Sequence, residues 1–355
     1  MSRSNRVAVV TGGAGFIGSA VVRMLIESTN VGVVNVDKLT YAANLRNIES
    51  VAASDRYCFV RADICDADAM TAVFKQHDPD CVLHLAAESH VDRSIDGPKD
   101  FLRTNVDGTF VMLQAALNHW RQMPAPRKEA FRFVHVSTDE VFGALGRDGL
   151  FSEESPYRPN SPYSASKAAS DHFVRAWHHT YGMPTIISNC SNNYGPYQFP
   201  EKLIPLVIAN AVDGLPLPVY AKGENVRDWL FVEDHARALW TIAEHGWPGE
   251  CYCIGGNSER RNLDVVRQIC KLLDRRRPRA DGKTHDADIT FVNDRPGHDL
   301  RYAIDAAKIR RELNFSPSVD FDEGLANTVQ WYLDHEDWWR PLLRREPAPA
   351  AVERR

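Results

Sequence analysis

The sequence predicts an α/β protein: a doubly wound parallel sheet with a smaller mixed α/β lobe. Three observations support this. The candidate strands of the first half are almost wholly apolar, they alternate with segments of helical spacing, and prolines and glycines become frequent beyond about Asn189. Apolar strands that alternate with helices are typical of a parallel sheet covered by helices on both faces.

Five strand-like runs define the predicted sheet. They are Val7 to Val10, Val31 to Val36, Tyr57 to Arg61, Cys81 to Ala86 and Phe131 to Ser137. Segments with helical periodicity lie between them, including Phe16 to Glu27 and Phe101 to Trp120. In such sheets the ligand crevice lies at the carboxyl ends of the strands. We therefore expect the residues that directly follow each strand to form the functional site.

The change in composition predicts the domain organisation. We expect residues 1–190 to form the sheet domain, and residues 191–345 to form mainly a second, substrate-binding lobe that is interleaved with the first. Leu217 to Tyr220 and Cys251 to Ile254 are short strand candidates of that lobe. The last residues, 346–355, are rich in proline and alanine and are predicted to be disordered.

Composition and charge exclude several classes of protein. The chain has 355 residues, 44% of them hydrophobic, and a net charge of −5, which gives no electrostatic basis for binding nucleic acid or an anionic membrane. No segment has the ~18 consecutive apolar residues of a membrane span, and the first residues do not resemble a signal peptide. The seven cysteines have neither metal-ligand nor redox spacing. We expect a cytoplasmic protein with reduced cysteines and no metal site.

A glycine-rich turn follows the first strand and opens the first helix, with the sequence Gly13-Ala14-Gly15-Phe16-Ile17-Gly18. Its glycines allow a tight turn and let backbone N–H groups approach a pyrophosphate at the helix N-terminus. Asp37 ends the second strand, where a carboxylate accepts the ribose hydroxyls of adenosine and repels a 2′-phosphate. This Rossmann pattern predicts NAD, in preference to NADP.

Further cofactor contacts are expected after the next two strands. Asp63 and Ile64 follow the third strand, where an adenine edge would be read, and the small Ala86 and Ala87 let the cofactor pass close to the fourth. The complete predicted cofactor set is Gly12, Gly15, Phe16, Ile17, Gly18, Asp37, Asp63, Ile64, Ala86, Ala87, Tyr163 and Lys167.

Tyr163 and Lys167 are four residues apart in a segment that is predicted to be helical from about Tyr163. This spacing places both side chains on one face of the helix. A neighbouring ammonium favours the phenolate, lowers the pKa of the tyrosine, and makes it usable as a base. The pair is common by chance, but beside a dinucleotide turn it predicts catalysis.

Thr138, Asp139 and Glu140 directly follow the fifth strand, at the edge of the sheet where the ligand is expected. A purely structural interpretation is that these residues cap a helix or turn. The functional interpretation is that two adjacent carboxyls in different surroundings have different pKa values, so that one acts as an acid and the other as a base.

Several motifs together resemble a known family. They are TGGAGFIGS at Thr11, VDKLTYAANL at Val36, HLAAESHVDRSI at His84, STDEVFG at Ser137, SPYSASKAASDH at Ser161, NNYGPYQFPEKLIP at Asn192, RDWLFVEDH at Arg227 and DRPGHDLRYAID at Asp294. The chain resembles the extended short-chain dehydrogenase/reductases and, within them, the dTDP-glucose 4,6-dehydratases. The TDE triplet is the most specific motif, since related epimerases carry small hydroxyl residues there.

The resemblance implies a reaction in three stages. Tyr163, assisted by Thr138 and Lys167, removes the proton of the glucose 4-hydroxyl while NAD takes a hydride. Glu140 then removes the proton at C5, and protonated Asp139 donates to the leaving hydroxyl at C6. The hydride returns to C6, so NAD is tightly bound and regenerated in each cycle. The implied substrate-binding residues are Ser89, Asn193, Glu201, Lys202, Arg227, Asn262, His298 and Tyr302.

Some alternatives remain open. A nucleotide-sugar 4-epimerase shares the fold, the cofactor and the Tyr–Lys pair, a dehydratase acting on UDP- or CDP-glucose shares the chemistry, and a non-catalytic NAD-binding scaffold shares the fold. The resemblance also implies a homodimer, with contacts through Phe101 to Trp120 and Asp171 to Tyr181. The chain departs from the family pattern at Ala43, commonly glycine, and at Phe142, commonly tyrosine.

Overall fold

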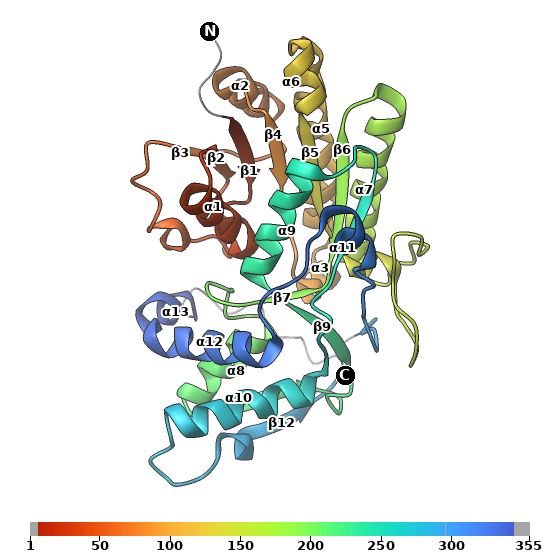
Figure 1. The fold of residues 1–355 in the computed structure, drawn as a ribbon. Coiled ribbons are helices and arrows are strands. Elements are labelled where there is room, and N and C mark those ends of the chain that lie inside the picture. Colours follow the sequence, from red (N-terminus) through yellow and green to blue (C-terminus); the bar gives the residue numbers. More distant parts are fainter. Residues whose placement is uncertain (1–5, 295, 344–355) are drawn as a thin grey trace.

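The structure, a computed structural model, describes residues 6–294 and 296–343. The tail predicted to be disordered, 346–355, lies outside the described residues. A large sheet with its helices occupies one end of the molecule, and a second group of helices, α8, α10, α12 and α13, lies at the other end (Figure 1). Among the described residues, no helix combines the length and apolarity needed to cross a membrane.

The large sheet has seven strands, and all of its strand pairs are parallel. In spatial order the strands are β10 (Cys251–Ile254), β6 (Thr185–Cys190), β5 (Arg132–Thr138), β4 (Cys81–His84), β1 (Val7–Thr11), β2 (Gly32–Asp37) and β3 (Tyr57–Arg61). Strands β2 and β3 are added on one side of β1, and β4, β5, β6 and β10 are added on its other side. The order of the strands therefore reverses between β1 and β4, and the carboxyl ends of these two strands form the switch point where such sheets bind ligands. The predicted doubly wound α/β class is confirmed.

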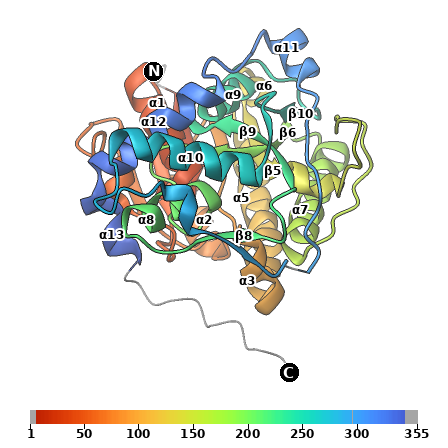
Figure 2. The same cartoon turned by 90° about the horizontal axis from the view of Figure 1, so that it is seen from below.

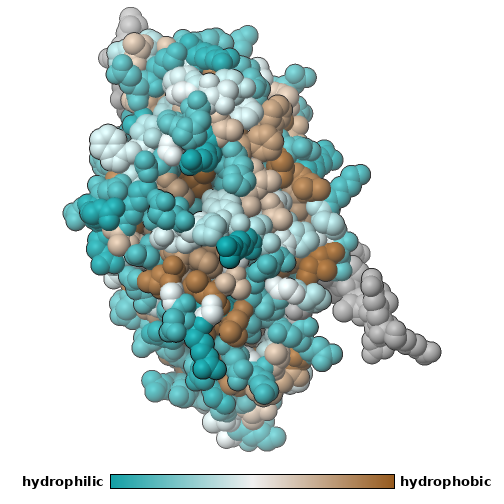
Figure 3. Space-filling model, turned by 90° about the vertical axis from the view of Figure 1, so that its right-hand side faces the viewer, coloured by the Kyte–Doolittle hydropathy of each residue, from teal (hydrophilic) through white to brown (hydrophobic). Residues whose placement is uncertain are grey.

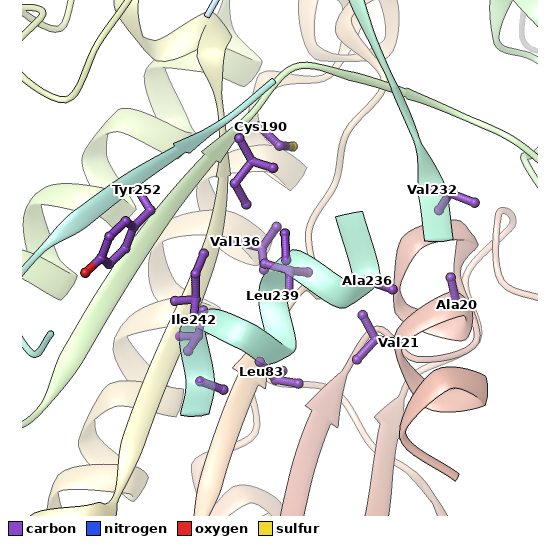
Figure 4. Close-up of a cluster of buried hydrophobic side chains, with 14 of the residues drawn as sticks. Ala20, Val21, Leu83, Val136, Cys190, Val232, Ala236, Leu239, Ile242 and Tyr252 are labelled. Atoms are coloured by element: carbon purple, nitrogen blue, oxygen red, sulfur yellow. The ribbon is translucent and has the colours of Figure 1, made fainter. Parts of the chain in front are cut away.

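Helices cover both faces of this sheet. On one face α1 (Phe16–Ser28) and α9 (Val232–His245) contact each other and bury an apolar cluster against the strands (Figure 4). On the other face α2 (Ala67–His77), α5 (Gly108–Gln122) and α7 (Pro162–Tyr181) form a second cluster. Figure 4 shows Val21 of α1 and Leu239 of α9 in the first cluster. This burial on both faces explains why the strands are apolar throughout.

The second lobe has its own apolar core. It contains α8 (Leu203–Val212), α10 (Asn262–Arg276), α12 (Phe321–Asp334) and α13 (Glu336–Leu343), with β7 (Asn192–Tyr194), β9 (Val226–Phe231) and β11 (Glu259–Arg261) in one small sheet and β8 (Leu217–Tyr220) and β12 (Ile289–Val292) in another. Figure 2 shows α8, α10 and α12 grouped together. Buried aromatic side chains, among them Trp339 and Tyr332, fill this core.

Shorter helical elements connect these parts. They are α3 (Val91–Asp96), α4 (Pro98–Phe101), a π-helical stretch (Leu102–Asp107), α6 (Ala125–Ala130), α11 (Ala307–Leu313), and 3₁₀ turns at Leu45–Ile48, Asp139–Phe142 and His285–Asp288. The long helical stretch predicted from Phe101 to Trp120 is therefore interrupted by π-helical geometry before α5 begins.

One strand lies elsewhere than the sequence suggested. Cys251 to Ile254 was expected in the second lobe, but as β10 it extends the large sheet next to β6. The preceding helix α9 packs back onto the large sheet, so the strand that follows it is delivered to the sheet edge. The seven cysteines are all free thiols.

Candidate active site

The glycine turn between β1 and α1 leaves no room for side chains. Gly12 has a φ of +72°, and a Cβ atom built there would lie 2.9 Å from the Cα atom of Ala86. A Cβ atom on Gly18 would lie 2.1 Å from the carbonyl oxygen of Gly12. Gly15 is the N-cap residue of α1, and no side chain caps this helix. Its first N–H groups are therefore available to a phosphate, so the turn fits a dinucleotide.

Asp37, at the end of β2, is tied to this turn. Its carboxylate accepts hydrogen bonds from the backbone N–H of Ala14 at 3.0 Å and of Leu39 at 2.8 Å. Burial raises the pKa of Asp37, and these two bonds oppose the increase. Each carboxylate oxygen has a second lone pair, so Asp37 keeps the capacity to accept ribose hydroxyls.

A single cavity at the carboxyl edge of the sheet brings most of the predicted residues together. Its lining includes Gly12, Gly15, Phe16, Ile17, Gly18, Asp37, Ile64, Ala86, Ala87, Ser89, Thr138, Asp139, Glu140, Tyr163, Lys167, Asn193, Glu201 and Lys202. These residues come from both the large sheet and the segment that enters the second lobe. The dinucleotide turn and the candidate acid, base and tyrosine therefore share one space.

Five predicted residues are not part of that lining. Asp63 lies beside the cavity, with a carboxylate oxygen 3.8 Å from Nζ of Lys38. Arg227, on β9, donates to the carbonyl oxygens of Val226, Asp299 and Leu300, and its guanidinium lies 4.3 Å from the centre of the Tyr302 ring.

Electrostatics nevertheless connects Arg227 and Tyr302 with the acid pair. Burial raises the pKa of both Asp139 and Tyr302; the charge of Arg227 opposes the rise for Asp139, and the charge of Glu140 adds to the rise for Tyr302. Asn262 begins α10, and its side-chain oxygen is buried without a hydrogen bond. His298 is paired with Asp294 at 2.5 Å.

The triplet Thr138-Asp139-Glu140 caps a turn, and its two carboxyls lie in different surroundings. Thr138 ends β5, and its hydroxyl accepts a weak hydrogen bond from the backbone N–H of Glu140 at 3.3 Å, which caps the 3₁₀ turn. Asp139 is 2% exposed, and one of its carboxylate oxygens has no hydrogen-bond partner. Burial, followed by the charge of Glu140, raises the pKa of Asp139 well above its usual value. Burial of this kind favours the protonated form of the carboxyl.

Tyr163 and Lys167 lie on one face of α7, as their spacing predicts. The expected lowering of the Tyr163 pKa by Lys167 is wrong for the protein alone: burial raises this pKa well above its usual value, the charge of Glu140 adds to the increase, and a hydrogen bond with Thr138 opposes it. The reason is that Tyr163 is only 9% exposed. Lys167 donates to the carbonyl oxygen of Val136 at 2.8 Å, and burial lowers its own pKa to about 8.

Sequence reasoning missed several residues of the cavity wall. Lys38, Thr104 and Gln198 also line it, and Nζ of Lys38 lies 3.4 Å from the hydroxyl of Thr104. The position of Lys38 directly after Asp37 was a usable signal, whereas Thr104 and Gln198 arrive from distant segments. The two family departures are accommodated: Ala43 has no positive φ, and Phe142 packs against Phe151 and Tyr157.

The cavity, the cofactor turn and the paired carboxyls define an NAD-dependent enzyme of the nucleotide-sugar dehydratase class. Residues 9–328 match the family described as GDP-mannose 4,6 dehydratase. Among curated relatives, the dTDP-glucose 4,6-dehydratase of Neisseria meningitidis serogroup B is 60% identical, over 95% of this chain and 96% of the relative.

Two solved structures are similar over nearly their whole length. The dTDP-glucose 4,6-dehydratase DesIV of Streptomyces venezuelae, with NAD bound, has a TM-score of 0.86 and 45% identity, covering 95% of this chain and 99% of that one. The dTDP-glucose 4,6-dehydratase of Bacillus anthracis, also in complex with NAD, has a TM-score of 0.84 and 44% identity, with the same coverage. The chain belongs to the dTDP-glucose 4,6-dehydratase family.

Proposed function

We propose that this chain converts dTDP-glucose to dTDP-4-keto-6-deoxyglucose and water, with NAD used and regenerated in each cycle. The observation that carries the proposal is that Asp139 and Glu140 line the same cavity as Tyr163, Lys167 and the dinucleotide turn. A 4-epimerase needs the tyrosine and the cofactor but has no step that expels water, so it has no use for the acid pair.

The first stage requires a base at the 4-hydroxyl. Tyr163 takes this proton, and Thr138 supports it through the hydrogen bond that favours the phenolate. Lys167 supplies a positive charge on the same helix face. Bound NAD, held by the glycine turn and Asp37, supplies the hydride acceptor for C4 and the hydride donor for C6.

The second stage requires an acid and a base side by side. Glu140 is only partly buried at the cavity and takes the proton of C5, which the new 4-ketone has acidified. Asp139 holds a proton because it is buried next to Glu140, and it donates this proton to the leaving hydroxyl of C6. Neighbouring residues thus receive opposite roles from their different exposure.

The nucleotide part of the substrate extends towards the second lobe. We propose that Arg227 and Asn262 contact the pyrophosphate, which the uncapped N-terminus of α10 at Asn262 supports. Asn193, Glu201 and Lys202 line the cavity and are proposed to contact the phosphates and the base, with Ser89 near the sugar. His298 and Tyr302 are proposed to close the pocket. Under this proposal residues 191–345 act mainly as the substrate lobe.

Incubation of the purified protein with dTDP-glucose tests the proposal. The expected product is a ketone with a base-sensitive chromophore, formed without net reduction of NAD. Formation of dTDP-galactose would favour the epimerase instead, and protein that holds NAD but turns over no nucleotide sugar would favour the scaffold. Parallel assays with UDP- and CDP-glucose test the preference for the nucleotide base of the substrate. We expect dTDP-glucose to have the highest kcat/KM.

We also propose that the protein is a cytoplasmic homodimer. Phe110 on α5 and Phe173 on α7 are 44% and 38% exposed, and they pack together with Trp177. The molecule is viewed from the α7 side in Figure 3, where apolar patches interrupt the polar surface. Light scattering of the wild type and of Phe110→Lys tests this: we expect a dimer and a monomer, respectively. The free cysteines support a reducing location.

A further inference from the structure

Lys167, His135 and Asp171 form a buried polar chain, of which Lys167 lines the cavity and the other two residues do not. Nζ of Lys167 lies 3.4 Å from Nε2 of His135, and this nitrogen lies 3.2 Å from a carboxylate oxygen of Asp171. The side chains of His135 and Asp171 are each 1% exposed. Three ionisable groups thus follow one another inside the protein, where burying them without a function is costly.

The backbone presents these groups to one another from two elements. Tyr163, Lys167 and Asp171 follow one another at intervals of four residues along α7, so all three lie on one helix face. His135 comes from strand β5, an inner strand of the large sheet, beside Val136, whose carbonyl oxygen also accepts from Lys167. The buried polar chain therefore begins at Lys167, which lines the cavity together with Tyr163, and leads away from that cavity.

Asp171 is held in place by several donors. The hydroxyls of Ser137 and Tyr157 donate to one carboxylate oxygen at 2.8 and 2.9 Å, and Asn189 makes a further hydrogen bond. The other oxygen faces His135 and has no hydrogen bond of good geometry. Donors of this kind favour a carboxylate over a carboxylic acid, although burial still raises the pKa of Asp171 to about 6.

His135 has one nitrogen for two neighbours. Its Nε2 atom either accepts a proton from Lys167 or donates one to Asp171, because a ring nitrogen carries either a lone pair or a hydrogen. Burial and the charge of Lys167 lower the pKa of His135 well below its usual value, so the ring is neutral. The charges on this chain therefore belong to Lys167 and Asp171, with a neutral ring between them.

We propose that Asp171 and His135 are positioning residues of the reaction, which keep Lys167 charged and fixed on the face of α7 that it shares with Tyr163. Asp171 acts by attraction, as the nearby anion that offsets the burial of the ammonium, and His135 acts by fixing the amine against β5. The inference rests on the proposed function, in which Lys167 assists Tyr163 as the base.

The titratable groups that face this chain come from every element around it. Around Lys167 and His135 they are His84 on β4, Cys190 on β6 and Tyr163 on the same face of α7. These three are neutral at pH 7 to 8, since burial raises the pKa of Tyr163 and Cys190 and lowers that of His84. Around Asp171 the titratable and charged groups are those that line a second cavity with it: Glu153, Glu154, Tyr157, His172, Arg175, His179, Glu250, Cys251 and Lys308. Asp171 is the anion whose charge raises the pKa of Lys167, so its removal should act on Lys167 directly.

The test is the pH profile of kcat/KM for dTDP-glucose in wild type and in Asp171→Asn. The substitution keeps the shape of the side chain and removes its charge, so the pKa of Lys167 falls. We expect the alkaline limb of the profile to move to lower pH by about one to three units. Wild-type NAD content is expected to accompany this shift, and the part of the acidic limb that reports protonation of Asp171, whose pKa is about 6, should be lost. A role in folding alone would reduce activity equally at all pH values.

Two further variants complete the test. Glu250→Gln removes a carboxylate that lines a second cavity together with Asp171, and its alkaline limb should match wild type. Tyr157→Phe keeps the Asp171 charge but removes a donor, which raises the pKa of Asp171. The acidic limb of the pH profile of Tyr157→Phe should therefore move to higher pH. This measurement tests the proposal even if Asp171→Asn fails to fold.

The proposal would be overturned if the pH profiles of kcat/KM of Tyr157→Phe and of folded Asp171→Asn both matched the wild-type profile. Absence of dehydratase activity in the wild type would instead contradict the proposed function. The raised pKa of Asp171 can also be tested without turnover, by measuring the midpoint of unfolding as a function of pH. A raised carboxyl pKa in the folded state lowers stability as pH rises from about 4 to about 6. This part of the profile should be lost in Asp171→Asn.

Discussion

Gly18→Ala tests the geometry of the cofactor turn with a single methyl group. Gly18 lies in the first turn of α1, where alanine would normally favour the helix by about 1 kcal/mol. Here the added Cβ atom would lie 2.1 Å from the carbonyl oxygen of Gly12 and 2.7 Å from its carbonyl carbon. Both are backbone atoms, so no flexible side chain can move aside.

The two effects have opposite signs, and the steric one should dominate. Overpacking in a well-packed region costs about 1–3 kcal/mol, and here the turn itself has to move by about 1 Å. A displacement of this size at a binding site costs about 100-fold in rate. The 2.1 Å approach to a backbone atom places the steric cost at the upper end of the range, about 3 kcal/mol. After the gain in helix propensity of about 1 kcal/mol is subtracted, about 2 kcal/mol remains, which corresponds to a fall in NAD affinity of about 30-fold.

The assay measures NAD retained after gel filtration and the affinity for added NAD by calorimetry. Gly32→Ala is the matched control, because a Cβ atom on that residue of β2 would make only ordinary contacts, the shortest being 3.5 Å to Val7. The control should retain wild-type NAD. If Gly18→Ala also retains wild-type NAD and activity, the close-approach argument for the turn is refuted.

Three further outcomes are expected. Glu140→Gln keeps the residues of the first stage and loses the base of the second, so reduced cofactor should accumulate on mixing with dTDP-glucose; loss of activity without this absorbance signal would place Glu140 in the first stage or in binding. Asp37→Ser removes the charge that repels a 2′-phosphate, so the NAD-to-NADP affinity ratio should fall by about tenfold or more in calorimetry, and an unchanged ratio would contradict the role of Asp37. Asp139→Asn should abolish turnover and raise the unfolding midpoint at pH 8: the folded pKa of Asp139 is raised, so its contribution to stability is lost as pH rises through that pKa. A midpoint difference that does not grow between pH 5 and pH 8 would show that Asp139 has an ordinary pKa.

Much of this site was predictable because it depends on strand ends. Thr138, Asp37 and Ala86 each lie at or after the end of a parallel strand, so their convergence follows from topology alone. The placement of β10 was not predictable in the same way. Its four residues, Cys251–Ile254, have the same apolar character in a small lobe or at a sheet edge, and only the return path of α9 decides between them.

Electrostatics was less predictable than position. The spacing of Tyr163 and Lys167 correctly predicts a shared helix face, but not that burial outweighs the lysine charge in setting the tyrosine pKa. Burial depends on packing against distant residues, which sequence spacing does not contain. The third member of the helix face, Asp171, was visible in the same spacing, but its partner His135 comes from another strand.

The same physical rule sets the charges on both sides of the tyrosine. In front of it Asp139 is enclosed beside a like charge, so the neutral acid is the stable form. Behind it Lys167 is enclosed beside the opposite charge of Asp171, so the ammonium is retained despite its burial. Both groups need their surroundings to stay dry, because water would screen Glu140 from Asp139 and Asp171 from Lys167 alike. The sign of the nearest charged neighbour therefore makes Asp139 an acid and Lys167 a cation, and the partly buried Glu140 is the carboxylate that takes a proton from the substrate under the proposed function.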